Sequence, residues 1–119
     1  MAFDTNKALY LYGEVEEIEI VNPAGADLTA HKPTPFSDSV VIPKNDIVSG
    51  AKGWFWDRGV FKVSKNASLV ISAGDKVYWD VAEGAVNKTA EDNTLMGTAL
   101  LDAGSTDAYC VVKLNTTYA

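Results

Sequence analysis

The sequence predicts an all-β fold, a small barrel or sandwich-like domain with a long proline-rich loop and a flexible N-terminal arm. Short β-prone runs recur at roughly 8–12-residue spacing, with turn residues between them. The best window for a helix, residues 3–11, is short and uncapped, so at most one helical turn is expected near an end. A chain of 119 residues with 47% hydrophobic residues suits one core without disulfides or metals. We therefore expect a single domain over residues 1–119.

The N-terminal arm is expected over residues 1–9 and the β domain over residues 10–115. The arm carries Phe3 and Leu9 without a flanking turn or a periodic pattern, so we expect it to become ordered only on a partner. Residues expected to contact that partner are Phe3, Leu9, Tyr10 and Tyr12.

The first strand is expected over residues 10–21, where glutamates at 17 and 19 alternate with isoleucines at 18 and 20. This alternation is typical of a half-buried strand with one acidic face. A turn at 22–25 leads into a loop over 26–38, which contains Pro33 and Pro35 and has little periodicity. Further strands are predicted at 39–42, 46–48, 53–56, 59–64, 68–72, 75–80, 85–88, 94–100 and 107–114.

Charge and composition argue against several classes of function. The net charge of −6 disfavours nucleic-acid binding, which depends on cationic contacts to phosphates. The N-terminus lacks the basic start and apolar run of a signal peptide, and no stretch approaches the roughly 20 apolar residues of a membrane span. We therefore expect a protein made in the cytoplasm that binds neither nucleic acid nor membrane.

No familiar catalytic or cofactor motif is present. The lone histidine, His31, and the lone cysteine, Cys110, do not supply the ligand set of a zinc site. The former is expected on a surface loop and the latter in the core. Neither a Gly-x-Ser-x-Gly elbow nor a phosphate-binding loop occurs. The sequence thus predicts no catalytic residues, no metal site and no cofactor.

Carboxylates and tryptophans are the remaining candidates. Glutamates 14, 16, 17 and 19 lie in one strand. Of these, Glu17 and Glu19 share a face and could bind a cation or serve in acid–base catalysis, although a solvated strand face that discourages aggregation is favoured. Trp54 and Trp56 share one face of a strand, and Trp79 belongs to a later strand. The three tryptophans are interpreted as core or interface anchors. The alternative is an exposed aromatic platform that stacks on sugar rings.

Several spaced segments resemble one family of small tailed-phage proteins, the capsid cement or head decoration proteins, whose members are sometimes labelled recombinase-like. The carrying segments are GDKVYWD (74–80), AV (85–86), NTLMGTAL (93–100) and VVKLN (111–115), preceded by YLYGEV (10–15) and GVFKV (59–63). The similarity covers residues 8–115. This chain departs from the family's pattern in its longer, proline-rich region at 24–42 and its aromatic run at 54–56.

The resemblance implies a β-barrel-like domain without catalytic activity that binds the outside of an icosahedral head. It implies attachment to the major capsid protein, often as a homotrimer near three-fold positions, and reinforcement of the shell against internal DNA pressure. The expected location is the outer surface of the capsid in the virion, after production in the host cytoplasm. The alternative is a carbohydrate-binding or host-adhesion module displayed on the virion.

Overall fold

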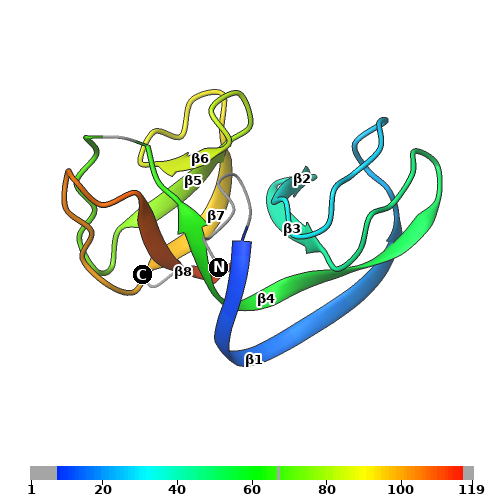
Figure 1. Cartoon of the computed structure of the whole chain (residues 1–119), viewed down its shortest axis with the longest axis horizontal. Helices are drawn as coiled ribbons and strands as arrows, with labels where there is room; N and C mark the ends of the chain where they lie inside the picture. Colours follow the sequence, from blue (N-terminus) through cyan, green and yellow to red (C-terminus); the bar gives the residue numbers. More distant parts are fainter. Residues whose placement is uncertain (1–7, 67, 117–119) are drawn as a thin grey trace.

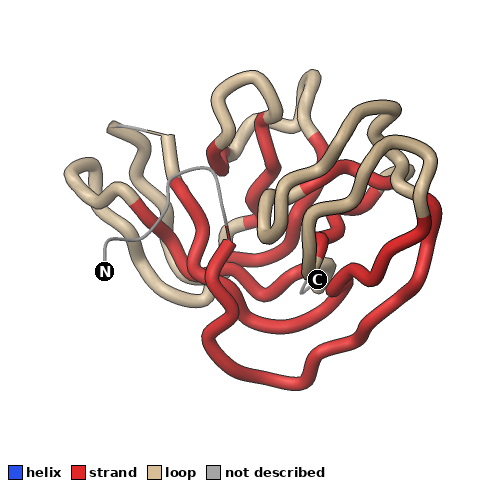
Figure 2. Tube along the Cα trace, turned by 45° about the vertical axis from the view of Figure 1, so that its right-hand side comes forward, coloured by secondary structure: helices blue, strands red, loops and turns tan. Residues whose placement is uncertain are grey.

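The computed structural model describes residues 8–66 and 68–116, which form eight strands and no helix (Figures 1 and 2). The strands are β1 (Ala8–Val21), β2 (Thr34–Phe36), β3 (Ser39–Pro43), β4 (Lys52–Ser64), β5 (Lys76–Asp80), β6 (Ala85–Asn87), β7 (Thr94–Ala99) and β8 (Tyr109–Leu114). The predicted all-β class is therefore confirmed. Most of the expected arm, residues 1–7, lies outside the described residues. Positions 8 and 9 already belong to β1, so this strand begins two residues before its predicted start.

All strand pairs are antiparallel and belong to one sheet, in the order β2-β3-β4-β8-β7-β5-β6, with β1 added on β4. The sheet curls until β6 meets the chain just beyond β4, through a parallel bridge between Lys65 and Val86. The second part of β4 and strands β5 to β8 thus enclose a small barrel half. In Figure 1 this half lies on the left, and a distal half containing β2, β3 and long loops lies on the right.

Two hydrophobic clusters fill the two halves. The larger surrounds Trp79 and Phe61 in the barrel half, and the smaller surrounds Phe55 in the distal half. Strand β3 separates them, because Val40 faces the larger cluster and Val41 the smaller, and both are at most 1% exposed. This position explains why residues 40–42 form a continuous apolar run rather than an alternating one.

Strand β4 corrects the prediction of two strands at 53–56 and 59–64. It runs through residues 57–59, which were expected to form a turn, because Gly59 adopts a positive φ of 135° that bends the strand without ending it. Strand β1 remains paired with β4 on both sides of the bend, at Trp56 and at Val60.

Four other segments also differ from their expected structure. The predicted strands at 46–48 and 68–72 form only single bridges, Leu28 to Ile47 and Ile71 to Ala103, because each meets only a loop. The expected loop at 26–38 contains β2, which forms a tight hairpin with β3. Residues 8–11, the end of the window considered for a helix, are strand, since pairing with β4 satisfies their backbone groups.

Candidate functional site

The long pair of strands β1 and β4 bends sharply where the two halves of the molecule meet. We call this bend, residues 12–16 of β1 and 57–59 of β4, the elbow. Register shifts in β1 between Tyr12 and Glu17, and positive φ values at Gly13 and Gly59, produce it. A Cβ on Gly59 would lie 3.0 Å from Val15 and 3.1 Å from Phe61. Glycine therefore allows the two strands to approach closely at the bend.

An aromatic cluster packs against the elbow. Trp56 stacks on Tyr10, with ring centroids 6.3 Å apart, and on His31 at 5.7 Å. Phe61 lies beneath, 5.7 Å from both Trp56 and Tyr10. We call these four residues together with Lys44 the elbow cluster. His31 is exposed on a loop, as predicted, but no pattern in the sequence indicated that this loop folds onto Trp56.

Two ion pairs link β1 to its neighbours near the elbow. The ammonium of Lys44 lies 5.6 Å from the Trp56 ring centroid and also pairs with Glu17. Arg58 pairs with Glu16 at 3.3 Å, with both side chains more than half exposed. Pairs this exposed contribute little to stability, but they neutralise two of the four glutamates in β1. Glu14 and Glu19 have no ion pair among the described residues.

Asp57 carries a buried carboxylate oxygen, Oδ1, that has no hydrogen-bond partner among the described residues. Burial raises the pKa of this carboxyl, and the negative charge of Glu16 raises it further. Nearby, the Asn115 side chain donates to the backbone oxygens of Asp57 and Val40, both at 2.8 Å. Asn115 thereby connects the end of β8 to β3 and to the elbow. Sequence reasoning missed this role because such long-range bonds leave no local pattern.

A shallow hollow of ≈ 290 Å³ opens at the elbow. It is lined by Tyr12, Gly13, Glu14, Arg58, Gly59, Val60, Leu100 and Lys113. Its volume is at the lower limit for a small-molecule pocket, so it is better matched to one or two side chains of a protein partner than to a cofactor.

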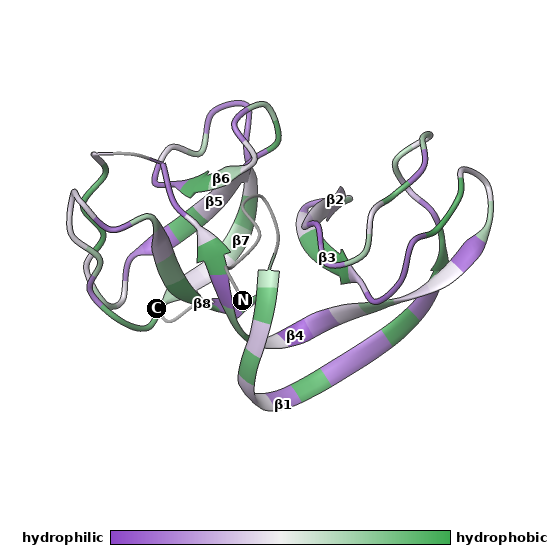
Figure 3. Cartoon of the chain, in the orientation of Figure 1, coloured by the Kyte–Doolittle hydropathy of each residue, from purple (hydrophilic) through white to green (hydrophobic). Residues whose placement is uncertain are grey.

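The first half of β1 exposes an unusual number of large apolar side chains. Leu9, Tyr10, Leu11, Tyr12 and Val15 are each 37–56% exposed, and Figure 3 shows apolar and polar residues alternating along the strand. Three of the four residues expected to contact a partner thus lie together on β1. Phe3 lies outside the described residues. Clustered exposed apolar residues are typical of interaction surfaces.

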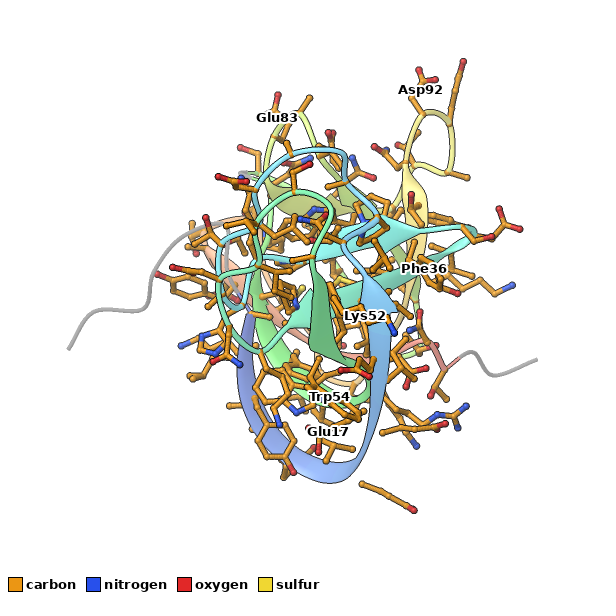
Figure 4. All side chains as sticks on the ribbon, turned by 90° about the vertical axis from the view of Figure 1, so that its right-hand side faces the viewer. Glu17, Phe36, Lys52, Trp54, Glu83 and Asp92 are labelled. Carbon is orange, nitrogen blue, oxygen red and sulfur yellow. The ribbon has the colours of Figure 1, made fainter. Side chains whose placement is uncertain are left out.

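The three tryptophans occupy three different environments. Trp79 is 1% exposed and belongs to the larger hydrophobic cluster, and Trp56 is partly buried against the same cluster. Trp54 is 49% exposed beside Glu17 and Lys52 (Figure 4), so it is not a core anchor. The structure therefore does not bring the three rings together into one aromatic platform.

Two further candidates from the sequence are the lone cysteine and a metal site. Burial raises the pKa of the Cys110 thiol to about 12, which keeps it protonated near neutral pH. Among the described residues, no group of three or more His, Cys, Asp or Glu side chains is placed to hold a metal ion. Within the same residues, no helix is long and apolar enough to cross a membrane.

Comparison with known proteins produced one match. The sequence model of a family described as phage cement protein matches residues 13–114. The matched range runs from the elbow to the end of β8 and contains the GDKVYWD and NTLMGTAL segments, which confirms the resemblance drawn from the sequence. A search of curated proteins found no match, and a search of solved structures found none either.

Proposed function

The chain belongs to the phage cement protein family, and from this membership, which gives it a structural role at a phage capsid, we propose that it binds the outer surface of the capsid and stabilises the head lattice. The observation that carries the proposal is the family match over residues 13–114. It includes most of β1 and all of β2 to β8, so the whole fold belongs to the family.

Exposed apolar side chains support a role in binding protein. Strand β1 presents Leu9, Leu11 and Tyr12 to solvent, and Trp54 is exposed on the neighbouring strand. Aromatic residues are enriched at protein interfaces. These residues lie along one long strand pair, which gives an extended contact suited to bridging neighbouring capsid subunits.

The proposed partner is the major capsid protein, and the proposed assembly on the capsid is a homotrimer. A copy that engages several subunits at once gains strength through effective concentration, even when each contact is weak. The protein acts by attachment and not by turnover. Its stabilising effect should therefore be measurable on the assembled capsid lattice and not on the isolated chain.

Capsids that lack this protein provide the test. They should bind the purified chain at a fixed stoichiometry, in multiples of three copies. Capsids with the chain bound should rupture at a higher temperature than capsids without it. Equal rupture temperatures with and without saturating protein would contradict the cementing role.

The carbohydrate-binding alternative is weakened by the structure. It requires the three tryptophans to act as stacking platforms, yet Trp79 is 1% exposed and the face of Trp56 is covered by Tyr10 and His31. Trp54 alone remains accessible. Titration with glycans should therefore leave the tryptophan fluorescence unchanged, and quenching would restore this alternative.

A further inference from the structure

The curled sheet has three outer strands, β1, β2 and β6, and two of them are closed to further pairing. Strand β2 is only three residues long and contains Pro35, which has no N–H to donate. Strand β6 is covered by the chain that follows β4, through the Lys65 to Val86 bridge and a bond from the Asn66 N–H to the Val86 oxygen.

Strand β1 is different, because among the described residues it pairs only with β4 and leaves its other edge open. It is 14 residues long, and only its first residue, Ala8, is buried. The Ala8 N–H donates to the His31 oxygen at the start of the strand, whereas the Asn22 N–H, just beyond the end of the strand, donates to the Ala51 oxygen and continues the ladder with β4. Between these two points, no bond from the outer edge to another described segment is present.

Most of the open edge is irregular, and one part is not. Register shifts interrupt the pairing between Tyr10 and Glu17, and bulges of this kind discourage a further strand from adding. Residues 17–21 instead pair with residues 52–56 without interruption. This segment is straight enough to act as a template for another strand.

The two faces of residues 17–21 differ in chemistry. Ile18 and Ile20 pack against the smaller hydrophobic cluster around Phe55, which holds the strand in place. Glu17 and Glu19 are exposed on the opposite face beside Trp54, which is the direct partner of Glu19 in β4 (Figure 4). A new strand beside this segment would meet carboxylates on one face and apolar side chains on the other.

We propose that the open edge of residues 17–21 binds an extended, basic segment of a partner protein as an added β-strand. Backbone hydrogen bonds would supply the pairing, and lysine or arginine at alternate positions would lie beside Glu19. Glu17 already has Lys44 as a partner, whereas Glu19 has no ion pair among the described residues. This inference specifies the chemistry of the partner segment in the proposed capsid attachment, and it rests on that proposed function.

A second copy of this chain fits the edge poorly. Antiparallel pairing of two such segments centred on residue 19 places Glu19 opposite Glu19, and pairing centred on residue 18 places Glu17 opposite Glu19. Like charges directly opposite each other destabilise a strand pair. The acidic edge therefore opposes self-pairing and favours a basic partner.

The test uses the full chain and short blocked peptides in which lysine and valine alternate. The amides of residues 17–21 should gain protection from hydrogen exchange when the peptide binds. Two N-methylated versions of the peptide separate strand addition from simple charge attraction. Each version carries methyl groups on the backbone nitrogens that face one edge of the extended peptide. One version should lose binding and the other should keep it, because only one edge of the peptide faces β1.

Charge variants identify the site. Glu19→Lys should weaken binding of the lysine peptide about tenfold and should allow binding of a peptide in which glutamate and valine alternate. Glu83→Lys is the matched control, since it makes the same charge change on an exposed turn at the opposite end of the molecule in Figure 4. It should change binding by less than about twofold.

Several results would overturn the proposal. These are equal binding of both N-methylated peptides, no protection of residues 17–21, equal effects of the two charge variants, or self-association of the chain through β1.

Rebinding to capsids distinguishes this failure from failure of the proposed function. If Glu19→Lys binds capsids as well as the unchanged chain, the edge is not the contact, while the cementing role stands. If the unchanged chain does not bind capsids, the cementing role fails, whatever the peptides do.

Discussion

The ammonium nitrogen of Lys44 lies 5.6 Å from the centroid of the Trp56 ring. Lys44 directly follows β3, its N–H donates to the Trp54 oxygen at 3.0 Å, and its side chain reaches Glu17 on β1. One residue therefore ties β3, β4 and β1 together beside the elbow.

Lys44→Met should lower the free energy of unfolding by about 1 kcal/mol, because it removes a cation–π contact and a partly exposed ion pair. Lys52→Met is the matched control, since Lys52 is exposed and has no ion pair among the described residues. Urea denaturation measures both variants. Equal stabilities for the two would mean that the Lys44 contact contributes nothing.

Trp79→Ala should cost ~3–5 kcal/mol, because the ring fills the larger hydrophobic cluster at 1% exposure. Trp54→Ala should cost under about 1 kcal/mol, since its ring is half exposed. Equilibrium denaturation compares them directly. A loss below about 1 kcal/mol for Trp79→Ala would show that the ring does not support the core.

Gly97→Ala should destabilise the protein by about 1–3 kcal/mol or more, because it forces β7 away from β8. A Cβ at this position would lie 2.0 Å from the backbone oxygen of Lys113, which cannot move without breaking the strand pair. Gly104→Ala is the control, as its nearest contact would be an ordinary 3.7 Å. Thermal unfolding that shows equal midpoints for both variants would contradict the close approach.

Asp75 should stabilise the fold in a pH-dependent way. A hydrogen bond from the Ser72 N–H lowers the pKa of its carboxyl, and Lys88 lowers it further. A folded-state pKa below the ordinary 3.8 means that the contribution is complete above that value and disappears as the pH falls through the folded-state pKa. Asp75→Asn should therefore be less stable than the unchanged chain at pH 7, and the difference should shrink in acid. A difference that stays constant with pH would contradict the charge effect.

Asp57 should show the opposite sign. Burial and Glu16 raise the pKa of this carboxyl above 3.8, so its ionised form costs stability at neutral pH. Asp57→Asn should be the more stable protein at pH 7, and its advantage should disappear as the pH falls through the raised pKa to below 3.8. Urea denaturation at several pH values would measure this, and a destabilised variant at pH 7 would show that ionised Asp57 is favoured in the fold.

Prediction from sequence succeeded best in the barrel half of the molecule. Strands β5 to β8 match the predicted segments closely, because both faces and both turns impose local patterns such as the GDKVYWD run. It failed at residues 57–59 and 68–72. A bent strand and a turn both place glycine and polar residues together, and an isolated bridge uses the same apolar residues as a strand. Only the presence or absence of a neighbouring strand separates these outcomes.

In the candidate site, too, the residue pattern predicts some features and not others. The exposure of Glu17 and Glu19 follows from their alternation with Ile18 and Ile20, and the sequence shows this pattern directly. That Trp54 is exposed while Trp56 is largely covered does not follow, since both share one face of a strand. The rings of Tyr10 and His31 stack on Trp56 and Phe61 packs against it, whereas Trp54 is 49% exposed.

The sequence by itself determined the all-β class, the order of most strands and the family, because each depends on residue patterns within short segments. The tertiary structure decided where the elbow lies, which tryptophans are covered and which strand keeps an open edge. These features depend on pairings between residues far apart in the chain, such as Glu19 with Trp54 and Lys65 with Val86. A local pattern encodes the tendency to form a strand, but it does not encode the partner, and the partner decides whether an edge or a side chain remains accessible.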